Sequence, residues 1–132
     1  MIFVDTSFWV ALRMRHDTHH PAAVALARAH GDAALVTTNH VRGETWTFVR
    51  RRTGHVAAVH FLDSLERSPR VEVISVGDDL ERAALRWLRR HDEREYFFVD
   101  TTSFAVMRER RIGEALAFDG DFAAAGFVEL RA

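Results

Sequence analysis

Short apolar runs and longer periodic stretches alternate along the chain. The short runs are rich in β-branched and aromatic residues, and they lie at residues 2–4, 35–38, 71–75, 96–99 and 114–118. Runs of this length predict buried strands. A further run at 128–130 is a candidate for a last strand at the edge of the sheet.

Between these runs, apolar residues recur every three or four positions, which predicts helices with one buried face. Phe8, Trp9 and Leu12 have this spacing in the first such stretch. Thr6 or Ser7 is the expected N-cap of that helix. We expect helices at about residues 7–13, 19–30, 39–52 with Asn39 as the N-cap, 56–65, 79–88 and 101–111.

Strands that alternate with helices predict a parallel sheet with right-handed crossovers. We therefore expect an α/β fold: a three-layer sandwich with a central parallel sheet of about five strands and helices on both faces. A chain of 132 residues and 15.1 kDa suits one compact core, so we expect a single domain over residues 1–132.

Acidic residues follow several of the predicted strands. The segment IFVDTS ends the first strand at Asp5, and its near repeat FFVDTTS ends the fourth at Asp100. The segment ALAFDGDF places Asp119 and Asp121 after the fifth, and Glu44 falls early in the helix that follows the second. Because the carboxyl ends of parallel strands meet at one edge of the sheet, these five acids are expected to share one crevice.

Five carboxylates in one crevice need a compensating charge. Two of them about 4 Å apart repel by about 4 kcal/mol at an effective dielectric of 20, and the chain contains no lysine or cysteine. A divalent cation supplies the charge, and oxygen ligands favour Mg²⁺, with Mn²⁺ as a substitute, over zinc. The chemistry that fits such a site is phosphodiester hydrolysis.

The order of these motifs resembles the PIN domain, in particular the VapC-type toxins of prokaryotic toxin-antitoxin pairs. The resemblance rests on IFVDTS, NHVRGETW, FFVDTTSFAVM and ALAFDGDF and covers nearly the whole chain. It implies a Mg²⁺-dependent endoribonuclease that acts on RNA, is blocked by a cognate antitoxin protein and usually forms a homodimer.

Carried over position by position, the resemblance assigns a catalytic quartet and its neighbours. Asp5, Glu44, Asp100 and Asp119 match the quartet, and Asp121 matches a second acid beside it. The implied metal ligands are Asp5, Asp100, Asp119 and Asp121, and the implied supporting hydroxyl after the first acid is that of Thr6 or Ser7.

Three other kinds of protein carry acids at strand ends. A haloacid dehalogenase-type metal-dependent phosphatase needs Asp-x-Asp after its first strand and a later Lys, whereas this chain has Asp5-Thr6-Ser7 and no Lys. A receiver domain also needs a Lys. A non-catalytic PIN-like binding module is the third alternative, and a cleavage assay separates it from a nuclease.

Basic residues offer a second, weaker signal. The net charge is −1, all 18 basic residues are Arg, and two clusters stand out: Arg50 to Arg52, and Arg108, Arg110 and Arg111. We expect RNA contact from the second cluster because its helix begins at Asp100, and a solvated helix end for the first. The group His16, His19 and His20 is expected to be a polar helix entrance.

The expected compartment is the cytoplasm. No apolar run approaches the length needed to span a bilayer, and Met1 leads directly into the first strand without a charged and apolar leader. The absence of cysteine is compatible with a reducing compartment.

Overall fold

Five parallel strands form one sheet in the computed structural model, which describes residues 1–132. The strands lie in the order β3-β2-β1-β4-β5, so the direction of winding reverses at β1. Ligand crevices in open α/β sheets lie at such a switch point. The bounds are β1 (Ile2–Val4), β2 (Leu35–Thr38), β3 (Val71–Ile74), β4 (Glu114–Leu116) and β5 (Val128–Glu129).

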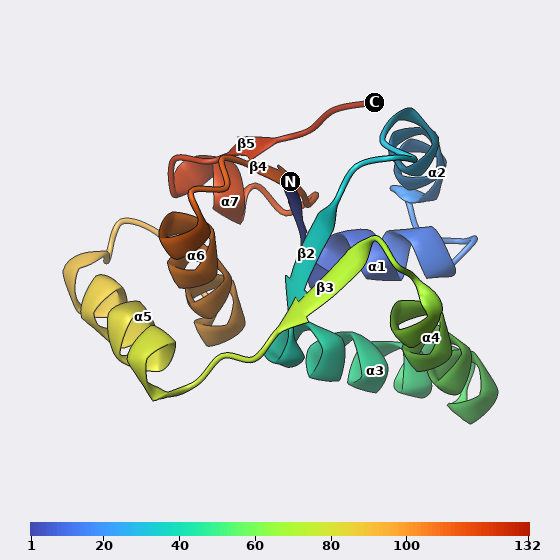
Figure 1. The fold of residues 1–132 in the computed structure, drawn as a ribbon, viewed down its shortest axis with the longest axis horizontal. Coiled ribbons are helices and arrows are strands. Elements are labelled where there is room, and N and C mark those ends of the chain that lie inside the picture. Colours follow the sequence, from blue (N-terminus) through green and yellow to red (C-terminus); the bar gives the residue numbers. More distant parts are fainter.

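Seven helices surround the sheet. Figure 1 shows α5 and α6 on one side of the strands and α1 and α4 on the other, which confirms the three-layer sandwich. In the same view α3 begins at the arrowhead of β2. The bounds are α1 (Thr6–Arg13), α2 (His20–Ala29), α3 (Asn39–Thr53), α4 (His55–Arg67), α5 (Asp78–Arg90), α6 (Phe98–Arg110) and α7 (Asp121–Ala124).

The prediction of a strand at residues 96–99 is wrong. Helix α6 already begins at Phe98, and β4 pairs directly with β1, so no place beside β1 remains for another strand. The side chains of Phe97 and Phe98 are 67% and 39% exposed, which a central strand would not allow. Asp100 therefore lies in the first turn of a helix and does not end a strand.

Two helix caps also differ from the predicted ones. Asp5, not Thr6 or Ser7, caps α1 by accepting a hydrogen bond from the Ser7 amide. Thr38, not Asn39, caps α3, since its hydroxyl accepts from the Val41 amide at 3.0 Å.

Asn39 makes a different contact. Its side-chain oxygen accepts from the Val76 amide at 2.8 Å and so links the start of α3 to the segment after β3. This link places the Glu44 helix against the carboxyl end of the sheet.

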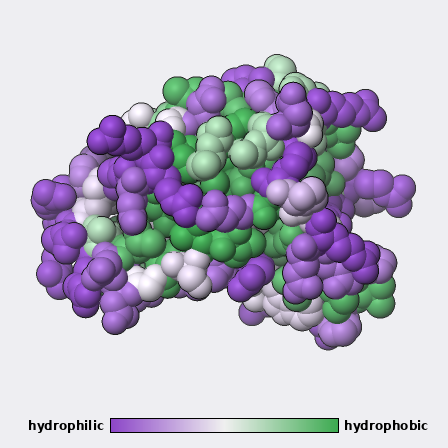
Figure 2. All heavy atoms as spheres, viewed as in Figure 1, coloured by the Kyte–Doolittle hydropathy of each residue, from purple (hydrophilic) through white to green (hydrophobic).

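The core lies on both faces of the sheet and is rich in aromatic rings. Phe3 of β1 stacks on Phe122 at 5.9 Å, and Phe104 of α6 meets Phe122 edge-on at 5.0 Å. Figure 2 shows hydrophilic side chains over the outer parts of the molecule and hydrophobic ones between them. None of the helices combines the length and the apolar character that crossing a membrane requires.

Candidate metal centre and active site

Asp5 lies directly after β1, at the switch point of the sheet. Its side chain is 2% exposed, and its Oδ2 accepts hydrogen bonds from the amide and the hydroxyl of Ser7 at 3.1 and 2.8 Å. The other carboxylate oxygen, Oδ1, is buried without a hydrogen-bond partner. One oxygen of Asp5 is thus held by the start of α1, and the other is left free for a ligand.

Asp100 reaches the same place from the first turn of α6. It is 5% exposed, and its Oδ2 is also buried without a partner. The hydroxyls of Thr101 and Thr102 do not hydrogen-bond to the Asp100 carboxylate, because they donate to backbone carbonyl oxygens of their own helix.

Asp119 completes a group of three carboxylates. It follows β4, is exposed, and has one oxygen within 4.8 Å of an oxygen of each of the other two acids. Ser7 ties this loop to Asp5, since its hydroxyl donates to Asp5 and accepts from the Phe118 amide at 3.0 Å. Of the two candidate hydroxyls, that of Ser7 contacts Asp5, whereas that of Thr6 is buried without a partner; the supporting role carried over from the family stays a prediction.

The group strongly resists full ionisation. Burial, and then the charge of Asp119, raise the pKa of Asp5 from 3.8 to about 7. Burial, and then the charges of Asp5 and Asp119, raise the pKa of Asp100, and burial raises that of Asp119. Three close carboxylates with two orphaned oxygens need either protons or a cation, and their hard oxygen donors fit a divalent ion such as Mg²⁺ or Mn²⁺.

The other two predicted acids are placed differently. Glu44 lines the same cavity from α3, but it is exposed and lies outside the group of three. Asp121 accepts a hydrogen bond from Arg94 at 2.6 Å, in an ion pair that no pattern in the sequence predicts. The roles of Glu44 in catalysis and of Asp121 in metal binding stay predictions.

Glu129 supports the site and was missed by sequence reasoning. Its carboxylate is 6% exposed and accepts from the amides of Gly120, Phe122 and Ala123 at 3.1 to 3.3 Å. It therefore fixes the start of α7 and the loop that carries Asp119. The only sequence signal is an acidic residue inside the short apolar run at 128–130 that predicts the last edge strand.

The cavity around the acids has a volume of about 380 Å³. Two residues that line the cavity were not predicted as part of the site. They are Phe97 and His19, and the His19 ring stacks on Phe118 with ring centres 4.6 Å apart. The histidines do not form a metal site, since His16 lines a neighbouring pocket and His20 contacts the Ala11 carbonyl oxygen. The full lining is Asp5, Thr6, Ser7, Val10, Asp17, His19, Glu44, Phe48, Phe97, Asp100 and Asp119.

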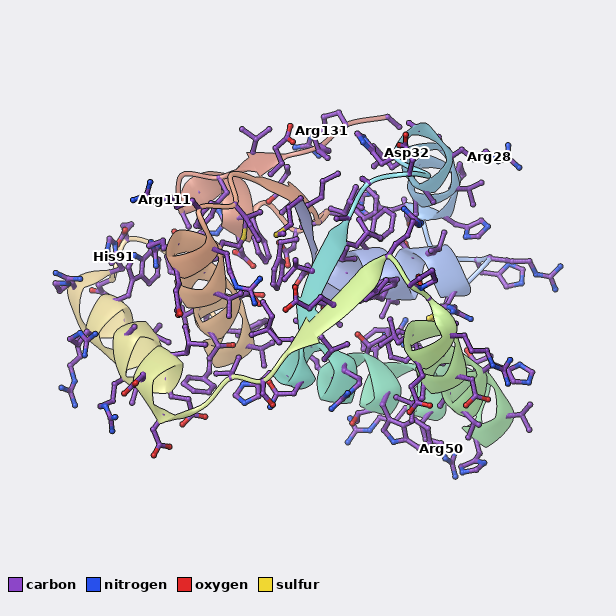
Figure 3. All side chains as sticks on the ribbon, viewed as in Figure 1. Arg28, Asp32, Arg50, His91, Arg111 and Arg131 are labelled. Atoms are coloured by element: carbon purple, nitrogen blue, oxygen red, sulfur yellow. The ribbon has the colours of Figure 1, made fainter.

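The arginines expected to contact RNA lie at the opposite end of α6 from Asp100. Figure 3 shows Arg111 there, past the last turn of the helix. The Arg108 guanidinium lies 5.2 Å from the centre of the Trp87 ring, and Arg110 forms an ion pair with Glu72 at 2.9 Å. RNA contact at these three positions stays a prediction.

Comparison with known proteins identifies close relatives over the full length. The PIN domain family model matches residues 2–128. The 23S rRNA-specific endonuclease VapC20 of Mycobacterium tuberculosis, in strains CDC 1551 and H37Rv, is 56% identical over 131 residues, which cover 99% of this chain and 98% of the relative. A crystal structure of M. tuberculosis VapC20, described as a sarcin-ricin loop cleaving toxin, superposes with a TM-score of 0.93 at 55% identity and full coverage of both chains.

Proposed function

The chain belongs to the PIN domain family, and from this premise we propose that it is a metal-dependent endoribonuclease of the VapC toxin type. The observation that carries the proposal is the group formed by Asp5, Asp100 and Asp119, whose oxygens lie within 4.8 Å of one another. The 56% identity to an endonuclease over 99% of the chain supports it independently.

The proposed roles follow from where each acid lies. Asp5, Asp100 and Asp119 would hold Mg²⁺ or Mn²⁺, with Asp121 as a further ligand once it leaves Arg94. Such a cation, when bound, lowers the pKa of a water and stabilises negative charge on the phosphoryl and leaving oxygens.

The chain's own residues contribute the rest. Glu44 is exposed on the wall of the cavity, where its carboxylate can accept a proton from an attacking water. Ser7 keeps Asp5 and the Asp119 loop at a fixed separation, because its hydroxyl bonds to both.

We propose 23S rRNA as the substrate, with the cut in its sarcin-ricin loop. The support is the similarity to VapC20, a 23S rRNA-specific endonuclease that cleaves the sarcin-ricin loop and whose structure covers the whole of this chain at 55% identity. The same likeness leads us to propose a cognate antitoxin as the partner, a homodimer as the resting assembly and the cytoplasm as the compartment.

Incubation of total cellular RNA with the protein tests the activity. We expect a discrete cut in 23S rRNA with Mg²⁺ and none with EDTA, and mapping of the cut ends gives the position. A folded protein that leaves all RNA intact with Mg²⁺ and with Mn²⁺ would instead support the non-catalytic binding module.

A further inference from the structure

We propose that an arginine groove beside the acidic cavity binds the phosphates of an unpaired RNA strand next to the scissile bond. The groove is formed by the end of α1, the segment after it and the last turn of α3, and its arginines are Arg13, Arg15, Arg51 and Arg52. The inference rests on the proposed nuclease function and adds to it the path of the substrate strand.

The groove is continuous with the acidic cavity. A pocket of about 450 Å³, lined by Arg13, Arg15 and Arg52, shares Asp17 with the cavity. A second pocket, lined by Arg51 and Arg52, shares Glu44 and Phe48 with it, and Arg52 belongs to both pockets. The shared residues place the arginines next to the cavity, so a chain that leaves the cavity past Asp17 or Glu44 reaches them.

The charge of the groove is suited to phosphate. Four arginines face two acids, Asp17 and Glu44, in a protein whose net charge is −1. None of the four forms an ion pair with a carboxylate of the chain. Guanidinium groups without acidic partners bind phosphate oxygens through their forked donors.

Arg13 differs from the other three arginines because its side chain is partly buried. It is half-buried, donates to the Ser64 hydroxyl and lies 5.8 Å from the centre of the Phe61 ring. Burial lowers its pKa because no carboxylate compensates the charge. A partly desolvated cation without a counter-charge is costly for the folded chain, and a bound phosphate would relieve this cost.

A favourable interaction with the helix dipole is the competing explanation for basic residues at the end of α3. It would treat Arg50, Arg51 and Arg52 alike. All three are exposed, but only Arg51 and Arg52 line the groove, whereas Arg50 lines neither pocket (Figure 3). The dipole gives no account of Arg15, which lies in the turn after α1, although it does apply to Arg13, the last residue of α1.

Aromatic rings favour an unpaired strand as the occupant. Phe48 lines both the cavity and the groove, with the Arg52 guanidinium 4.3 Å from its ring centre. Phe97, on the cavity wall, is 67% exposed. Rings beside phosphate-binding cations are typical of single-strand sites, because they stack on bases that are not paired.

Binding is tested with the double variant Arg15→Gln/Arg52→Gln and a matched control, Arg28→Gln/Arg50→Gln. Both remove two positive charges, and the control residues are exposed and outside the groove (Figure 3). All proteins carry Asp5→Asn so that the RNA stays intact, and a thermal melt confirms that each is folded. The probe is a short, fluorescein-labelled, unpaired RNA, titrated by anisotropy between about 50 and 200 mM salt.

We expect the groove variant to bind roughly 10-fold more weakly at about 100 mM salt and to lose about 0.7 of the salt slope per phosphate contact. The control is expected to keep the slope of the parent protein. Equal slopes for the two double variants would overturn the proposal. So would equal binding of the annealed duplex, or displacement of the RNA by a polyglutamate peptide at equal charge, which would identify an acidic protein segment as the occupant.

Cleavage kinetics separate this inference from the nuclease proposal. With Asp5 restored, the groove variant is expected to raise KM with kcat nearly unchanged, because it removes binding and no reacting group. If the wild type cleaves RNA but the groove variant binds RNA as tightly as the control, the groove proposal is overturned and the nuclease proposal stands. The opposite outcome is also possible to observe. If the wild type cleaves no RNA with any divalent cation, but the groove variant still binds RNA more weakly than the control, the nuclease proposal is overturned and the groove stands as an RNA-binding site.

Discussion

Replacement of Asp5 by Asn should stabilise the metal-free protein at alkaline pH while it removes activity. Asn retains an oxygen to accept from Ser7, so the cap of α1 is preserved, and it removes one of three mutually repelling charges. The gain in stability is expected because the Asp5 carboxylate is buried and is repelled by the charge of Asp119.

The sign follows from proton linkage. The pKa of Asp5 is about 7 in the folded chain and 3.8 in the unfolded one, so the folded state binds the proton more tightly between these values. The contribution of Asp5 to the free energy of unfolding is therefore fully present below about pH 4 and is lost as the pH rises through 7. The difference between the folded and unfolded pKa of Asp5 corresponds to at most about 4 kcal/mol in the free energy of unfolding, since each pKa unit is worth 1.36 kcal/mol.

Urea unfolding in EDTA, at pH 5 and at pH 8, measures the effect. We expect the wild type to lose stability between the two pH values and Asp5→Asn to lose less, so that the variant is the more stable protein at pH 8 by about 2 kcal/mol. Asp92→Asn is the control, because Asp92 is exposed in the loop before α6. A variant that is destabilised equally at both pH values would refute the reasoning, since it would show that the Asp5 carboxylate supports the fold.

Three further predictions concern the metal, the loop of the site and the distant arginines. Mg²⁺ or Mn²⁺ should raise the melting temperature of the wild type but not of Asp100→Asn, because an ion that binds only the folded cluster stabilises it; equal melting with EDTA and with excess metal would contradict this. Glu129→Gln should cost about 1–3 kcal/mol in urea unfolding, because the amides of α7 lose a charged acceptor, and a neutral effect would show that the loop is held otherwise. Joint replacement of Arg108, Arg110 and Arg111 by Gln should flatten the salt dependence of RNA binding by about 0.7 per lost contact if the sequence prediction holds; an unchanged slope would reject it.

Sequence patterns predicted the acids better than the elements that carry them. Asp5 and Asp119 follow real strands, β1 and β4, so strand-end reasoning placed them correctly. Asp100 reaches the same crevice from a helix, because a short aromatic run can open a helix as readily as it fills a strand. Only the pairing of β1 with β4, a contact between distant residues, decides between the two.

No local sequence pattern predicts the contacts that hold the acidic residues in place, because these contacts join residues that are far apart in the sequence. Arg94 meets Asp121 across 27 residues of sequence, and the Ser7 hydroxyl meets the Phe118 amide across 111. Which arginines lie near the cavity depends on the direction in which α3 and α6 run from it. Arg52 lines a pocket connected to the acids, whereas Arg108 lies at the far end of its helix, and only the fold determines this difference.

Single-turnover cleavage of 23S rRNA by the wild type and by Asp119→Asn, each with Mg²⁺, tests the central claim most directly. Asp119 is the exposed member of the carboxylate group, so its loss should disturb the fold least. We expect one discrete cut by the wild type, abolished by EDTA, and a rate at least about 100-fold lower for the variant, because loss of even the partners that hold a metal ligand costs about 10- to 100-fold. Cleavage by Asp119→Asn at the wild-type rate, or cleavage that persists in EDTA, would contradict it.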